Sequence, residues 1–194
     1  AALSIIDTFG KDPFLILISC ILSLRTKDTV SLPASIRLFS YARTPQEMLG
    51  LPPKDLEEFI YPVGFYKQKT LHIKEICTVL LEKYGGHVPS RTKDLLSLKG
   101  VGLKTTNLVL GLGFDIPALC VDTHVHRISN ELGFVCTKNA DETEAALQKV
   151  VPKTYWIEYN TLLVMWGQNM CPANTKKCKG CVLKDICLRN NFSL

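Results

Sequence analysis

The spacing of apolar residues limits the possible folds of this chain more than any other feature. Apolar side chains recur at three- and four-residue intervals along most of the sequence, whereas alternating runs of β-branched and aromatic residues are nearly absent. Gly, Pro, Asn and Asp residues interrupt the pattern at short intervals, as they do where helices begin and end. We therefore expect an all-α protein, with helices over residues 13–24, 29–40, 46–50, 54–60, 67–84, 92–98, 103–113, 123–132, 141–150 and 155–167.

The composition is that of a folded protein and modestly favours a polyanionic partner. Hydrophobic residues make up 46% of the 194 residues, and the net charge is +5. The most apolar stretch, Phe14–Leu24, is shorter than the roughly 18 residues that a membrane span requires. No secretory leader is recognisable, so we expect an intracellular monomer in the cytoplasm, nucleoid or nucleus, without membrane association.

Four cysteines late in the chain have the spacing of a shared metal centre. Cys171, Cys178, Cys181 and Cys187 form the pattern C-x6-C-x2-C-x5-C within 17 residues that contain little apolar material. One ligand bound by four thiolates would supply the order that this segment cannot obtain from a core. Zinc sites usually pair two short Cys-x(2–4)-Cys knuckles, so the longer gaps favour iron–sulfur over zinc. The other cysteines lack ligand spacing and are expected in the core: Cys20, Cys77, Cys120 and Cys136.

Two glycines lie between predicted helices in the segment Leu98-Lys99-Gly100-Val101-Gly102-Leu103-Lys104-Thr105. Glycines in a tight turn let a phosphate approach the backbone, and the N-terminus of the following helix favours an anion. Gly100, Val101 and Gly102 are therefore predicted to grip a DNA backbone without reading sequence. The alternative is a plain interhelical turn with glycine caps.

Lys104 and Asp122 are the candidate catalytic residues. Lys104 follows the hairpin directly, on the first turn of the next helix, where the helix dipole disfavours a cation and so favours the neutral, nucleophilic amine. Its alternative role is phosphate binding. Asp122 follows eighteen residues later in the segment Val121-Asp122-Thr123-His124, where it also fits as the N-cap of a helix that begins at Thr123. Capping and catalysis are compatible roles for one carboxylate.

The hairpin GVGLKT, the segment VDTH and the cysteine pattern, in this order, resemble the endonuclease III family of helix-hairpin-helix DNA glycosylases. The resemblance covers nearly the whole chain. It implies two helical lobes with a DNA cleft between them. Residues 6–116 would form a six-helix barrel that contains the hairpin motif at about 92–113, and residues 1–5 with 117–194 would form the cluster lobe.

The resemblance also implies roles for individual residues. Lys104 matches the lysine that forms a Schiff base, and Asp122 the catalytic aspartate. The four late cysteines match the ligands of a 4Fe-4S cluster. Arg25 lies where the family often has a Gln that fills the gap left by the flipped nucleotide. Phe65 lies at the wedge position, with a core position as its alternative.

Three further residues are weaker candidates for DNA contact. His124 would contact the backbone near the site, or else pack on a helix. Lys176 and Lys177 lie between the cysteine ligands, where a clamped loop would aim them at phosphates; without the clamp they would be a mobile charge run. The chain departs from the family pattern at Lys99, Leu103 and Thr106, where Pro, Arg and Ala are common.

The function implied is that of a base-excision-repair glycosylase with AP lyase activity. It would remove oxidised pyrimidines from duplex DNA through a Lys104 Schiff base and β-elimination, and its partner would be double-stranded DNA with a damaged base or abasic site. One alternative is a monofunctional glycosylase for adenine or mismatched thymine, which activates water and lacks the lysine. Others are a DNA-binding module without catalysis and a zinc-dependent nucleic-acid binder.

Overall fold

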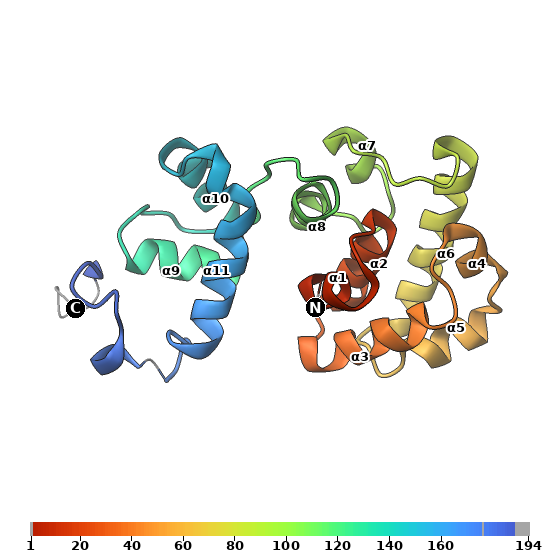
Figure 1. The fold of residues 1–194 in the computed structure, drawn as a ribbon, viewed down its shortest axis with the longest axis horizontal. Coiled ribbons are helices and arrows are strands. Elements are labelled where there is room, and N and C mark those ends of the chain that lie inside the picture. Colours follow the sequence, from red (N-terminus) through yellow and green to blue (C-terminus); the bar gives the residue numbers. More distant parts are fainter. Residues whose placement is uncertain (1, 176, 189–194) are drawn as a thin grey trace. The chain divides into compact units, whose positions relative to one another are not determined.

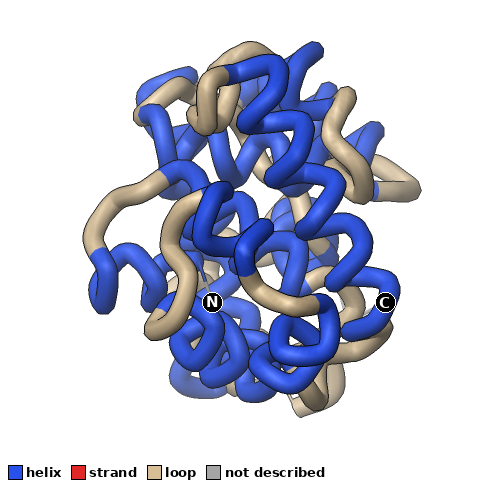
Figure 2. Tube along the Cα trace, turned by 90° about the vertical axis from the view of Figure 1, so that its right-hand side faces the viewer, coloured by secondary structure: helices blue, strands red, loops and turns tan. Residues whose placement is uncertain are grey.

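The structure is a computed structural model that describes residues 2–175 and 177–188. These residues form helices and loops without a strand, so the predicted all-α fold is confirmed (Figures 1 and 2). The elements are α1 (Ala2–Phe9), α2 (Pro13–Ser23), α3 (Asp28–Phe39), α4 (Pro45–Gly50), α5 (Pro53–Ile60), α6 (Tyr66–Tyr84), α7 (Thr92–Leu96), α8 (Leu103–Leu108), the π-helix η1 (Val109–Gly113), α9 (Thr123–Glu131), α10 (Ala140–Val150), the 3-10 helix η2 (Lys153–Tyr155), α11 (Trp156–Asn169) and the 3-10 helix η3 (Cys178–Gly180).

The chain divides into two compact units at Asp115 and Ile116. The sequence placed this boundary at residues 116 and 117, and it assigned residues 1–5 to the second lobe. In the structure, residues 2–5 belong to the first unit instead. The reason is that α1 packs against α2 and α3, which buries Ile5 completely.

Helix α2 forms the centre of the first unit. All residues from Phe14 to Leu22 are buried, because α2 is surrounded by α1, α3, α6, α8 and η1. An apolar surface on every side of a helix requires such burial. Asp12 caps the helix by accepting hydrogen bonds from the backbone N–H of Phe14 at 2.7 Å and of Leu15 at 3.2 Å. A stable central helix gives the unit a fixed frame for its surface loops.

A separate apolar core holds the second unit together. Leu119, Val121, Val125 and Leu147 are its buried members. Six partly buried side chains pack against them: Val135, Ala140, Val151, Trp156, Tyr159 and Leu163. The side chain of Asn160 on α11 donates to the backbone oxygen of Cys120 at 3.1 Å, which fixes the segment that leads into α9.

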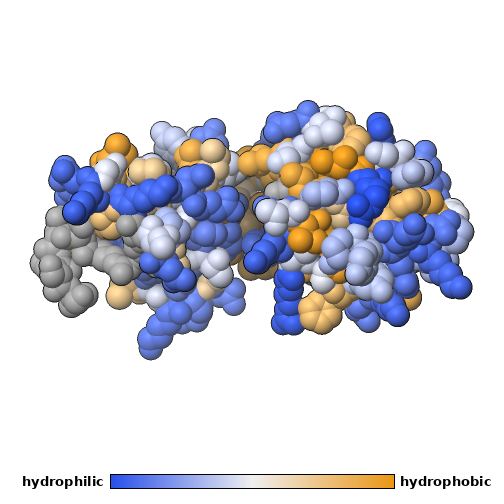
Figure 3. Space-filling model, turned by 90° about the horizontal axis from the view of Figure 1, so that it is seen from below, coloured by the Kyte–Doolittle hydropathy of each residue, from blue (hydrophilic) through white to orange (hydrophobic). Residues whose placement is uncertain are grey.

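The molecular surface is mixed in character. Figure 3 shows hydrophilic side chains over much of the visible face of each unit, with apolar side chains among them. Within the described ranges, no helix combines the length and the apolarity needed to cross a membrane.

Candidate active site and metal centre

The predicted hairpin lies between α7 and α8, so the helix-hairpin-helix motif is confirmed. Gly100 has φ +74°, a left-handed conformation that favours glycine. A Cβ on Gly100 would also lie 2.7 Å from Nδ1 of His72 on α6, which is too close for any side chain. Gln68 hydrogen-bonds the other ring nitrogen of His72 at 3.0 Å. The turn therefore rests directly on α6.

Val101 and Gly102 have different environments. The side chain of Val101 is only 7% exposed, and its N–H donates to the oxygen of Leu98 at 3.1 Å. Val101 therefore contributes packing here, and its N–H is already used. No atom lies within 4 Å of the position that a Cβ on Gly102 would take. Gly102 opens α8, where the first N–H groups of a helix lack intrahelical acceptors. N–H groups of this kind can donate to an anion such as a phosphate.

Lys104 and Asp122 belong to different units, and each lies at the start of a helix. Lys104 is exposed on the first turn of α8. Asp122 is the N-cap of α9, and its Oδ1 accepts from the backbone N–H of His124 and of Val125, each at 2.9 Å. The predicted capping role is confirmed. The cap uses Oδ1, so the carboxylate is held at a defined place by its own helix.

Arg25 and Phe65 share an unusual backbone conformation. Their φ angles are +51° and +58°, in a region that non-glycine residues rarely occupy. Both side chains are exposed, and that of Phe65 is 65% exposed. The alternative that Phe65 is a core residue is therefore wrong. The exposure is compatible with the wedge position that the family resemblance implied for Phe65.

His124 packs against α11. A Cβ on Gly167 would lie 2.3 Å from Nδ1 of His124, so the ring occupies the space that a larger side chain would need. This contact supports the helix-packing alternative for His124, and its contact with DNA stays a prediction.

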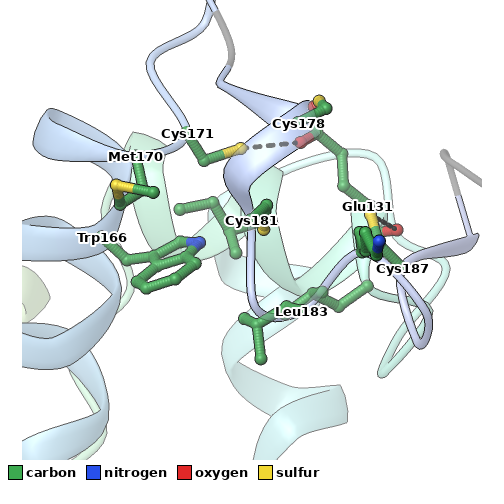
Figure 4. Close-up of a pocket in the computed structure, with 11 residues that line it drawn as sticks. Glu131, Trp166, Met170, Cys171, Cys178, Cys181, Leu183 and Cys187 are labelled. Atoms are coloured by element: carbon green, nitrogen blue, oxygen red, sulfur yellow. Dashed lines mark hydrogen bonds between the residues drawn. The ribbon is translucent and has the colours of Figure 1, made fainter.

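The four late cysteines line one cavity of about 90 Å³ in the second unit (Figure 4). Apolar side chains form much of its wall: Ile128, Leu132, Trp166, Met170 and Leu183. The thiols of Cys171 and Cys187 lie 3.6 Å from Oε2 and 3.5 Å from the backbone oxygen of Glu131, respectively. Cysteines that are up to 16 positions apart in sequence are thus gathered around one space, as their spacing predicts.

Arg127 of α9 connects the cavity to its helix. It donates to Sγ of Cys171 at 3.4 Å and to the backbone oxygen of Cys171 at 2.5 Å, and it pairs with Glu131 at 3.1 Å. Burial raises the pKa of the Cys171 thiol, and the Arg127 hydrogen bond acts in the opposite direction. A positive donor beside a sulfur favours the thiolate, which is the form that binds metals.

The cysteines surround the cavity and do not converge on one point. In residues 2–175 and 177–188, no three His, Cys, Asp or Glu side chains come close enough together to hold a metal ion.

Lys176 lies outside the described residues, and Lys177 is exposed. Cys20, Cys77 and Cys120 are buried as predicted. The prediction for Cys136 was wrong: it is exposed, because it lies in the loop between α9 and α10.

A hairpin with an open helix N-terminus, a lysine directly after it and a cysteine-lined cavity define a helix-hairpin-helix DNA-repair protein. The sequence matches the family described as "HhH-GPD superfamily base excision DNA repair protein" over residues 18–153. The chain belongs to this superfamily and, within it, to the endonuclease III family.

The similarity extends over almost the full chain. The chain is 49% identical to endonuclease III of Thermotoga maritima, over 91% of this chain and 83% of the relative. A trapped covalent intermediate of endonuclease III with DNA has a TM-score of 0.86 and 33% identity, and covers 98% of this chain and 93% of that one. A thermostable thymine-DNA glycosylase has a TM-score of 0.84 and 25% identity, with the same coverage. The chain is thus a base-excision-repair DNA glycosylase with the AP lyase activity of its family.

Proposed function

We propose that Lys104 is the nucleophile of this enzyme and that Asp122 assists it in removing oxidised pyrimidines from duplex DNA. The observation that carries the proposal is the position of Lys104. Lys104 is exposed on the first turn of α8, directly after the hairpin. A hairpin that holds a phosphate through the N-terminus of α8 would therefore bring this amine to the sugar of the same strand.

The reaction begins with extrusion of the damaged nucleotide, because its C1′ atom cannot be reached inside the stack. The lone pair of the Lys104 amine forms a bond to C1′, and the base leaves with the electrons of the glycosidic bond. Asp122 stabilises the positive charge that develops on the sugar and helps to move protons. The attached amine then loses a proton, and the C1′–O4′ bond breaks as O4′ takes up a proton, which opens the sugar ring and gives the protonated Schiff base. Loss of a proton from C2′ then expels the 3′ phosphate by β-elimination.

Arg25 and Phe65 serve the extrusion step. An exposed aromatic side chain beside the duplex acts as a wedge between base pairs, and a long cation fills the space left by the flipped nucleotide. Damage that weakens stacking lowers the cost of extrusion, which favours oxidised or ring-fragmented pyrimidines. We infer that the protein acts as a monomer in a compartment that contains DNA.

The late cysteines hold a 4Fe-4S cluster. The all-cysteine donor set is typical of iron–sulfur clusters, and thiols placed around a cavity suit a multi-atom cluster better than a single zinc ion. Such a cluster, when bound, stabilises the fold of this segment. The four cysteines would supply its thiolates, with Arg127 fixing Cys171. Lys176 and Lys177 would then contact phosphates from a loop of defined shape.

Mismatched thymine is the second candidate substrate, because the thymine-DNA glycosylase has nearly the same fold as this chain. Lys104 accounts for the bifunctional mechanism, since a water-activating enzyme has no use for an amine at this position.

The test is covalent trapping of the enzyme on lesion DNA with borohydride, which reduces a Schiff base. Lys104→Gln should abolish trapping and strand scission while duplex binding persists. Lys99→Gln is the matched control, because Lys99 is the other exposed amine of the same hairpin segment. Trapping that survives in Lys104→Gln, or that disappears in Lys99→Gln, would assign the chemistry to another amine.

A further inference from the structure

Two surface loops of the first unit carry Arg25 and Phe65, the residues that the proposed function assigns to the opened base pair. Arg25 lies in the loop after α2, and Phe65 ends the loop before α6. Each residue has a left-handed backbone that costs about 1–2 kcal/mol relative to ordinary conformations. Such conformations persist only where the surrounding structure fixes them. The contacts that fix these two loops therefore decide where both side chains point.

The two loops touch each other closely. The N–H of Gly64 donates to Oγ1 of Thr26 at 3.2 Å. A Cβ on Gly64 would lie 3.2 Å from the backbone oxygen of Arg25 and equally close to Thr26 Oγ1. Gly64, directly before Phe65, thus contacts both Arg25 and Thr26, and a shift of one loop would disturb the other.

Lys69 joins both loops from inside the protein. Its Nζ donates to the backbone oxygens of Leu22 at 2.8 Å and Leu24 at 2.6 Å, and to Oγ1 of Thr26 at 3.1 Å. These acceptors lie on both sides of Arg25. Thr26 Oγ1 in turn accepts from the N–H of Gly64, so the Lys69 side chain is connected to the Phe65 loop through this hydroxyl. An ammonium group has three donors, and all three have acceptors here.

The amine of Lys69 is itself no contact for DNA. The residue is 5% exposed and has no carboxylate partner among the described residues. Burial lowers the pKa of Lys69 to about 8. A cation kept inside a protein without a counter-charge is costly, so its three hydrogen bonds have a specific structural task.

We propose that Lys69 is a positioning residue for base extrusion, which holds the Arg25 and Phe65 loops together so that both side chains enter the duplex as one unit. This inference rests on the proposed function, in particular on the roles of Arg25 and Phe65. It assigns to Lys69 a part in the extrusion step and none in the chemistry at C1′.

Lys74 offers a matched control on the same helix. Its Nζ donates to three backbone oxygens, those of Met48, Leu49 and Leu51, at the end of α4, and its pKa is likewise lowered by burial. Lys69→Met and Lys74→Met each delete three hydrogen bonds made by one ammonium group. Both should lower the melting temperature, but only Lys69→Met should alter the handling of DNA.

The experiment combines two rates and one fluorescence signal. Single-turnover excision of an oxidised pyrimidine requires extrusion of a stacked base, whereas a preformed abasic site has no base to extrude. Fluorescence of 2-aminopurine beside the lesion reports unstacking directly. We expect Lys69→Met to slow excision by about tenfold, equivalent to about 1.4 kcal/mol of barrier, and to reduce the fluorescence rise. Cleavage of abasic sites and the salt dependence of DNA binding should change little, because no phosphate contact is removed.

Thr26→Val is a milder second variant, in case Lys69→Met does not fold. It removes the hydroxyl that accepts from both Lys69 and Gly64, and should shift the same ratio of rates in the same direction. Adding Phe65→Ala to Lys69→Met should cause little further loss, since both act on one step.

The failures of the two proposals are distinguishable. If the wild-type protein cleaves neither lesion DNA nor abasic DNA, the proposed function is wrong and the role of Lys69 falls with it. If the wild type is active, but Lys69→Met and Lys74→Met have the same ratio of excision to abasic cleavage, the positioning role alone is overturned.

Discussion

The two glycines of the hairpin should respond in opposite ways to the same substitution. In Gly100→Ala, the new methyl group would be forced into a left-handed backbone at about 1–2 kcal/mol. It would also displace the His72 ring, whose 3.0 Å hydrogen bond to Gln68 is worth about 0.5–1.5 kcal/mol. The sum is about 1.5–3.5 kcal/mol, which lowers the melting temperature by roughly 3–14 °C in a protein of this size.

Gly102→Ala should leave stability nearly unchanged. The φ of −101° suits alanine, and nothing lies within 4 Å of the new Cβ. Replacing glycine at a compatible position stabilises by about 0.4–1 kcal/mol, and the poorer N-cap offsets this by a few tenths. The methyl group would instead occupy space that a phosphate needs. Loss of one hydrogen bond to a charged group, about 1.5–3 kcal/mol, weakens DNA binding by about tenfold to a hundredfold.

Thermal melting and fluorescence anisotropy with a duplex that carries a non-cleavable abasic analogue separate the two effects. Gly100→Ala should melt earlier, and Gly102→Ala should melt normally but bind weakly. Normal binding by Gly102→Ala would refute the contact between this helix N-terminus and phosphate. Normal melting of Gly100→Ala would refute the close contact with His72.

Three more substitutions test single contacts. Asp122→Asn retains a side-chain oxygen that can cap α9, so its free energy of unfolding should lie within about 1 kcal/mol of the wild-type value. It should nevertheless excise bases far more slowly in a single-turnover assay. The same change should have opposite signs at two buried threonines in denaturant unfolding. Thr106→Val should stabilise the protein by about 1 kcal/mol, because the Thr106 hydroxyl has no hydrogen-bond partner among the described residues. Thr143→Val should destabilise it, because the Thr143 hydroxyl donates to the backbone oxygen of Asn139 at 2.7 Å. The pKa of Lys69 is lowered from 10.5 to about 8, so the native state releases this proton at a lower pH than the unfolded state does. The free energy of unfolding should therefore rise with pH between these two pKa values. Thermal melts at a series of alkaline pH values should show this rise in the wild type and not in Lys69→Met.

Periodicity predicted the helices well, because most of them bury one face against a neighbouring helix of their own unit. All ten expected helices occur, with ends within two residues of those predicted. Helix α1 was not predicted, since its eight residues are too few for a clear pattern and its stability comes from packing Ile5. The stretch from Leu103 to Gly113 was predicted as one helix, but its second half is the π-helix η1. That change of pitch depends on packing, where Gly113 lies against Pro13 of α2.

The site was predictable where a residue acts through its own type and local position. The N-cap role of Asp122 and the gathering of the four cysteines belong to this kind. The engaged N–H of Val101 and the exposure of Cys136 do not, because each depends on how a loop folds back on its neighbours.

Helix α6 contains the clearest examples of contacts that could not be predicted from the sequence. Lysine is almost never fully buried, so Lys69 in the run Tyr66-Lys67-Gln68-Lys69 would be assigned to the solvent face. Its acceptor on Leu22 is 47 positions away, and no local pattern connects the two residues. Three residues later, His72 supports the hairpin turn. Helix α6 thus begins next to Phe65, contacts the loop of Arg25 through Lys69 and supports the hairpin turn through His72. A rigid common support is what an enzyme needs if its wedge, its filler and its grip on the backbone must engage one nucleotide together.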